Sequence, residues 1–186
     1  ATSANLWNFA ERYVVRGELD RVLTRPLNSL FQVLLETVEV ESLLGGLGGV
    51  ALMAWAGRRL ALDVSWADLP LLLALTAGSV LVYNGVFIAL ASVAFWTDSR
   101  SGLIPLVWNL HVYGRYPVEI YDRWLRFLLT WVLPLSFAAF YPATYLLDRA
   151  AWRAYALATP AVGLAVFALG LLAWNAGLRR YRGAGW

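Results

Sequence analysis

The fold of this chain is decided by residues 69–97, LPLLLALTAGSVLVYNGVFIALASVAFWT, which contain no charged side chain. A transmembrane α-helix needs about 20 consecutive, predominantly apolar residues, and this stretch exceeds that length. Trp66 and Trp96 stand near its two ends, where indole rings favour the lipid headgroup layer. We therefore expect a membrane-spanning helix here.

The composition of the whole chain indicates the same environment. Of its 186 residues, 60% are hydrophobic and only 15% are charged, with a mean hydropathy of +0.60. Soluble domains are usually about half apolar and about a quarter charged. The net charge of +3 is too small to indicate a nucleic-acid partner. The absence of cysteine excludes disulfides and thiolate metal sites. The chain also lacks lysine, and with it the P-loop that binds nucleotide phosphates, so we expect no catalytic site, cofactor or metal.

Three further stretches are apolar enough to cross a membrane, namely residues 33–57, 124–141 and 158–178. The first is long enough only if it starts before Glu36, Glu39 and Glu41, which would then lie near a headgroup layer. After the 69–97 span, the apolar piece Leu103–Leu110 is too short to cross and is expected to lie at the interface. The sequence thus predicts an all-α, polytopic membrane protein. It would form a single transmembrane domain over residues 1–186, with about four transmembrane helices and short re-entrant or interfacial helices.

A charged, amphipathic element, residues 9–27, precedes these spans. Its apolar residues recur at helical spacing and include Leu19, Val22, Leu23 and Leu27. Arg16 and Asp20 lie four residues apart and are expected to pair along one face. Pro26 disfavours helix at Arg25, so the helix should break there. Two interpretations are open: a coupling helix that docks on a partner subunit, or a helix resting on the inner leaflet.

The distribution of arginine predicts the orientation, because cytoplasmic loops carry an excess of positive charge. With residues 9–27 inside, the inner side carries eleven arginines: Arg12, Arg16, Arg21, Arg25, Arg100, Arg115, Arg123, Arg126, Arg179, Arg180 and Arg182. The outer side carries four: Arg58, Arg59, Arg149 and Arg153. This asymmetry favours both termini in the cytoplasm.

Two features within the spans indicate specialised packing. Pro142, among aromatic residues, predicts that the chain leaves the 124–141 span and re-enters the membrane edge. Tyr141, Pro142 and Tyr145 are therefore candidate outer-gate residues; the alternative is a span that simply ends at Phe140. Gly45 and Gly49 have the GxxxG spacing that lets helices approach closely, and they are candidate helix-packing residues.

Three motifs carry a family resemblance. The stretch Gly17–Leu27 reads G-x-L-D-x-x-L-x-R-P-L, residues 140–143 read Phe-Tyr-Pro-Ala, and the basic tail reads GLRRYRGAGW over residues 177–186. In this order they resemble the permease subunits of ABC exporters of the type-two class. Such permeases usually have six spans, so the resemblance implies that this chain is the C-terminal two-thirds of one.

The resemblance also implies a function and partners. The expected function is the membrane subunit of an ATP-driven exporter, and the expected partners are an ATP-binding-cassette ATPase, a second permease subunit and membrane lipid. The expected location is the inner membrane of a bacterium. The ATPase would be coupled through Gly17, Leu19, Asp20, Leu23, Arg25, Pro26 and Leu27. A membrane-embedded enzyme or scaffold without an ATPase is the alternative.

Overall fold

The computed structural model describes residues 4–36, 40–60, 65–97, 104–147 and 150–181, and every regular element in these ranges is helical. Four short helices form an N-terminal segment: α1 (Ala4–Trp7), the π-helix η1 (Ala10–Val15), α2 (Glu18–Leu23) and α3 (Ser29–Leu35). Three long helices follow, namely α4 (Val40–Arg59), α5 (Leu69–Ser92) and α9 (Arg153–Arg180). The all-α fold expected from the sequence is confirmed.

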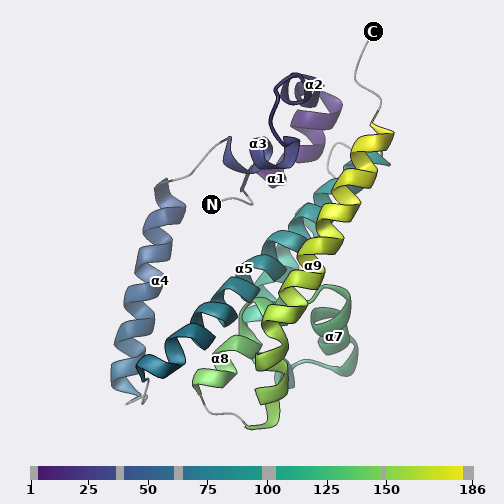
Figure 1. Cartoon of the computed structure of the whole chain (residues 1–186). Helices are drawn as coiled ribbons and strands as arrows, with labels where there is room; N and C mark the ends of the chain where they lie inside the picture. Colours follow the sequence, from purple (N-terminus) through teal and green to yellow (C-terminus); the bar gives the residue numbers. More distant parts are fainter. Residues whose placement is uncertain (1–3, 37–39, 61–64, 98–103, 148–149, 182–186) are drawn as a thin grey trace.

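Helices α5 and α9 form the centre of the molecule and lie side by side along most of their length (Figure 1). They run parallel, since Gly78 contacts Pro160 near their beginnings and Phe95 contacts Gly177 near their ends. The two elements that contain them, Trp66–Phe95 and Ala150–Arg180, are the candidate membrane spans by length and hydropathy among the described residues. At about 1.5 Å per residue, both exceed the roughly 30 Å hydrocarbon core of a bilayer.

Glycine allows the backbones of α5 and α9 to touch. Gly78 and Gly85 on α5 and Gly163 and Gly170 on α9 are each spaced by a heptad, so each pair faces the other helix. A Cβ added to Gly163 would lie 2.5 Å from the Gly78 carbonyl oxygen, and one added to Gly170 would lie 2.6 Å from that of Gly85. No larger residue fits at these positions without moving the helices apart.

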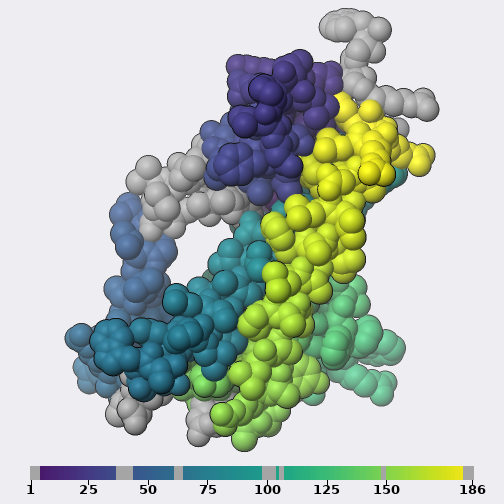
Figure 2. All heavy atoms as spheres, in the orientation of Figure 1, coloured from purple at the N-terminus to yellow at the C-terminus, as the bar shows by residue number. Residues whose placement is uncertain are grey.

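Helix α4 is arranged differently. It stands apart from α5 along most of its length, and Figure 2 shows open space between them. A Cβ added at Gly45 or Gly49 would have no neighbour within 4 Å. The close helix packing in this structure therefore involves the glycines of α5 and α9. The packing role expected for Gly45 and Gly49 requires a helix outside the described residues.

The chain returns from the end of α5 to the beginning of α9 through short, broken elements: α6 (Ile104–His111), η4 (Val112–Arg115), η5 (Val118–Ile120), α7 (Arg123–Phe127), η6 (Leu128–Val132), η7 (Leu135–Ala138), α8 (Phe140–Leu146) and η8 (Ala150–Trp152). The return is already complete at Glu119, whose carboxylate accepts a 2.6 Å hydrogen bond from Trp152 Nε1. Residues 104–120 therefore lead back to the beginning of α9, ahead of the stretch 124–141 in which the sequence predicts a span.

The stretch 124–141 is not a single helix. Pro134 has no N–H to donate, and the backbone leaves helical geometry at Leu133 (φ −118°, ψ 87°) and again at Ala139 (φ −143°, ψ −57°). Residues 128–146 therefore form a folded unit of η6, η7 and α8, which packs on α5 and on the first half of α9. The backbone thus breaks at Leu133, next to Pro134, and again at Ala139, so the short helix that contains Pro142 is not a continuation of the preceding one.

These contacts define two ends of the molecule. The α2 end holds residues 4–36, Phe95 and the close of α9. The Trp152 end holds the close of α4, the beginning of α5, residues 118–127 and Trp152 (Figure 1). Arg126 donates to the Val118 carbonyl at 3.0 Å, and so lies at the Trp152 end. The sequence had grouped Arg123 and Arg126 with the α2 end. The expected distribution, with eleven arginines on one side and four on the other, therefore does not match the position of Arg126 in the structure.

Candidate functional site

The amphipathic element becomes a short, well-defined helix at the α2 end. Gly17 precedes α2 with a left-handed φ of 74°, a conformation that glycine adopts without strain. Helix α2 ends at Leu23, and the Thr24 hydroxyl donates to the Arg21 carbonyl at 2.8 Å. Asn28 then caps α3 by accepting from the Phe31 amide at 3.2 Å. The turn between α2 and α3 contains Pro26. A side-chain hydrogen bond closes the helix before this turn, and another caps the helix after it.

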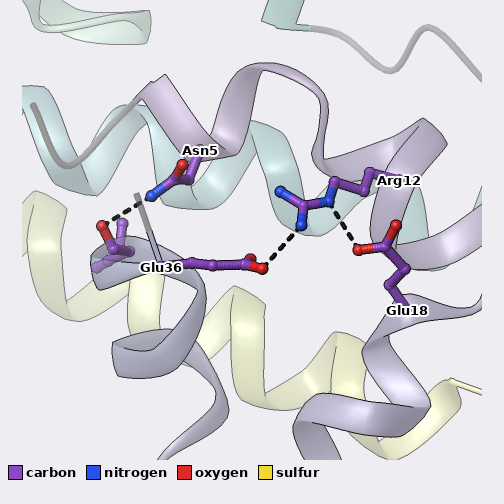
Figure 3. Close-up of polar contacts among 5 residues, drawn as sticks. Asn5, Arg12, Glu18 and Glu36 are labelled. Atoms are coloured by element: carbon purple, nitrogen blue, oxygen red, sulfur yellow. Dashed lines mark hydrogen bonds and ion pairs between the residues drawn. The ribbon is translucent and has the colours of Figure 1, made fainter. Parts of the chain in front are cut away.

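Arg12 fixes the position of α2, as Figure 3 shows. Its Nε donates to Glu18 at 2.7 Å, and its Nη2 donates to Glu36 at 2.7 Å. One guanidinium therefore joins η1 to the start of α2 and to the end of α3. The hydrogen bond from Arg12 to Glu18 is the largest of the influences that raise the pKa of Arg12 above its ordinary value. Arg12, like other arginines in proteins, is charged at physiological pH.

Further hydrogen bonds hold the same unit together. Gln32 on α3 donates to the Val22 carbonyl at 3.1 Å and to the Leu27 carbonyl at 3.0 Å. Asn5 on α1 donates to the Leu34 carbonyl at 3.1 Å. Side chains on α1 and α3 thus bond to backbone oxygens of neighbouring elements, which orders the segment as one body.

The apolar face of α2 is used inside the chain. Leu19 is completely buried in a cluster with Tyr13, Leu30 and Val33, so it is not presented to a partner. The expected pairing of Arg16 with Asp20 does not form; Arg16 bonds instead to Glu11 on η1 at 2.5 Å. The structure therefore corrects the role expected for Leu19, because this side chain anchors α2 to its own chain.

The opposite face of α2 and the following turn are exposed. Leu23, Arg25, Pro26 and Leu27 are exposed, and Asp20 is half-buried. Beside them lies a hollow of about 330 Å³, lined by residues that include Glu18, Arg21, Arg25, Leu27, Phe31 and Glu36. Leu27 and Phe31 are 62% and 57% exposed. Apolar side chains surrounded by charged ones are the usual anatomy of a specific protein interface.

An aromatic cluster connects this surface to the two central helices. Trp174 of α9 is 2% exposed and lies 4.9 Å from the ring of Phe9 and 5.4 Å from that of Phe95. Its Nε1 donates to the Ser29 hydroxyl at the start of α3 at 3.3 Å. Displacement of the N-terminal segment is therefore resisted by α9 directly. The sequence gives no sign of this link, because Trp174 lies near the end of the expected span 158–178, where tryptophan commonly faces the headgroup layer.

The candidate gate residues lie at the Trp152 end. Tyr141 is 1% exposed, stacks on Tyr155 at 4.9 Å and bonds to the Thr130 hydroxyl at 3.0 Å. Pro142 lies in the first turn of α8, where its missing N–H breaks no helical bond. Tyr145 is half-buried, with the Arg153 guanidinium 6.0 Å from its ring centre. In this conformation Tyr141 is part of a buried aromatic cluster.

The part of the chain that the structure describes contains no cluster of three or more His, Cys, Asp or Glu residues that could hold a metal ion. Its polar groups instead organise a surface at the end of two long apolar helices. Such a fold is typical of a helical membrane protein. The profile of the ABC-2 family transporter proteins matches residues 1–185, so the chain belongs to that family. The type-two ABC permease resemblance is thereby confirmed, and the chain is a membrane transport protein. No curated protein and no solved structure matches the chain significantly.

Proposed function

We propose that this chain is the membrane subunit of an ATP-driven exporter and that its α2 surface binds the ATPase. The α2 surface comprises Asp20, Arg21, Leu23, Arg25, Pro26 and Leu27. The observation that carries the proposal is the clamp around Arg12, since its bonds to Glu18 and Glu36 make α2 a rigid projection. A rigid projection can transmit force between two bodies, whereas a helix resting loosely on lipid cannot.

The proposed path of coupling runs from α2 to the transmembrane helices. Closure of the ATPase would push on the α2 surface, and Ser29 and Trp174 would carry that displacement to α9. Because α9 and α5 touch backbone to backbone at Gly163 and Gly170, the two helices would move as one body. Translocation of cargo would then follow from movement of this pair against the other helices.

The proposed topology has four crossings: α4, α5, the return through residues 104–120, and α9. The α2 end would face the cytoplasm of a bacterial cell and hold the C-terminus. This orientation follows from the proposed contact between the α2 surface and the ATPase, because ATP is hydrolysed on the cytoplasmic side. A second permease subunit would complete the transporter, and ATP hydrolysis would take place in the partner alone.

The test is a charge deletion on the exposed face of α2. Asp20→Ala with Arg25→Ala removes one acid and one base from the α2 surface and leaves the Arg12 clamp intact. We expect normal membrane insertion but reduced copurification with the ATPase and loss of ATPase stimulation. The matched control is Glu11→Ala with Arg16→Ala, which deletes an exposed ion pair on η1. Wild-type copurification and stimulation in the Asp20 and Arg25 variant would refute the proposal.

A further inference from the structure

A second cavity lies at the α2 end, on a different set of elements from the α2 surface. Its volume is about 920 Å³, and its walls come from η1, from η3 (Val93–Phe95) with the two residues after it, and from the end of α9 with Tyr181. The lining residues are Val14, Val15, Ala94, Phe95, Trp96, Thr97, Ala176, Arg179, Arg180 and Tyr181. Residues distant in sequence thus build one pocket where both long apolar helices end.

The pocket has an apolar part and a positively charged part. Val15, Ala94 and Ala176 give an apolar wall, while Arg179 and Arg180 place two cations at its margin. Both arginines are exposed, and neither forms an ion pair with a described carboxylate. Trp96, which is 45% exposed, adds an indole ring of the kind that favours the headgroup layer. The pocket therefore suits a ligand with an anionic group next to an apolar body.

We propose that this pocket binds the headgroup of an anionic phospholipid. Its phosphodiester would lie between Arg179 and Arg180, and the glycerol and first acyl carbons would lie against Val15 and Ala176. Arginine binds phosphate oxygens through paired N–H donors, and basic pockets at the cytoplasmic side of transmembrane helices attract anionic headgroups. Position separates this ligand from a soluble phosphate: the pocket opens at the ends of α5 and α9, where lipid headgroups lie if these helices span the membrane.

The test measures binding of a short-chain phosphatidylglycerol to the purified full chain in neutral detergent, by native mass spectrometry. Arg179→Gln with Arg180→Gln should weaken binding about thirtyfold, taking about 1 kcal/mol for each arginine near a membrane surface and 1.4 kcal/mol for each tenfold. The matched control is Arg58→Gln with Arg59→Gln, the adjacent pair that closes α4 at the Trp152 end. This control should bind as the wild type does.

A second variant separates a pocket from simple surface charge. Ala176→Trp fills the pocket with an indole ring and keeps both arginines, so it should also weaken binding. Equal binding by wild type and the Arg179 and Arg180 variant would overturn the proposal, as would undiminished binding by Ala176→Trp. If millimolar inorganic phosphate displaced the bound lipid as effectively as added lipid does, the pocket would be a site for any anion. That result would overturn the lipid assignment. Each result stands whether or not an ATPase binds at α2.

Discussion

The contact between α5 and α9 gives a prediction whose magnitude follows from the structure. In Gly170→Ala, the new Cβ would lie 2.6 Å from the Gly85 carbonyl oxygen, so the helices must separate by several tenths of an ångström. Overpacking of this kind costs about 1–3 kcal/mol. Gly48→Ala is the matched control, because it makes the same substitution at a helical position where the new Cβ would have no neighbour within 4 Å. Both variants gain about 1 kcal/mol of helix propensity, so their difference isolates the contact.

The assay is thermal unfolding of the two variants in the same detergent. For a chain of this size, 1 kcal/mol shifts the melting temperature by roughly 2–4 °C. Gly170→Ala should therefore melt roughly 2–12 °C below Gly48→Ala. Equal melting temperatures would mean that the two backbones do not touch at Gly170, and the rigid pair required for coupling would be lost.

Three other outcomes follow from the same structure. Arg12→Ala should destabilise the chain by only about 1 kcal/mol, because exposed ion pairs contribute little, yet it should lower copurification with the ATPase, while Arg16→Ala should not. Tyr141→Phe should cost about 1 kcal/mol in a melting experiment by removing the bond to Thr130. It should leave ATPase stimulation unchanged; loss of stimulation would make Tyr141 part of a gate. In intact cells, a membrane-impermeant thiol reagent should label Ser65→Cys and spare Thr24→Cys; the reverse pattern would invert the topology.

Much of the architecture was predictable from the sequence because the bilayer imposes a simple requirement on length and polarity. The uncharged stretch 69–97 contains α5, and 158–178 lies within α9. Helix α9 starts before Pro160, however, and continues through it. The stretch 124–141 does not form the single helix that its hydropathy predicts, and three of its apolar residues, Leu129, Leu135 and Phe137, are buried inside the protein. Hydropathy does not distinguish burial in protein from burial in lipid.

The helix α2 was predictable from the sequence, but the direction in which its apolar face points was not. Helical spacing located the apolar residues of α2 and gave no sign that Leu19 faces the chain's own core. Glu36 appeared to belong to an acidic cluster ahead of a span, whereas it pairs with Arg12. The packing glycines were also missed, because Gly78 and Gly85 follow a heptad rather than the four-residue spacing of Gly45 and Gly49. Contacts between distant segments depend on the tertiary fold, and local patterns in a single sequence do not reveal them.

The central claim, that the α2 surface binds an ATPase, is tested most directly by site-specific photo-crosslinking in membranes. A photoreactive residue placed at Leu23, which is 46% exposed on α2, should crosslink to the ATP-binding subunit. The same residue at Trp66, which is 87% exposed at the Trp152 end, should not. Crosslinks to the ATPase from Leu23 alone are the predicted result. Crosslinks from Trp66, or none from Leu23 while the complex is intact, would contradict the account.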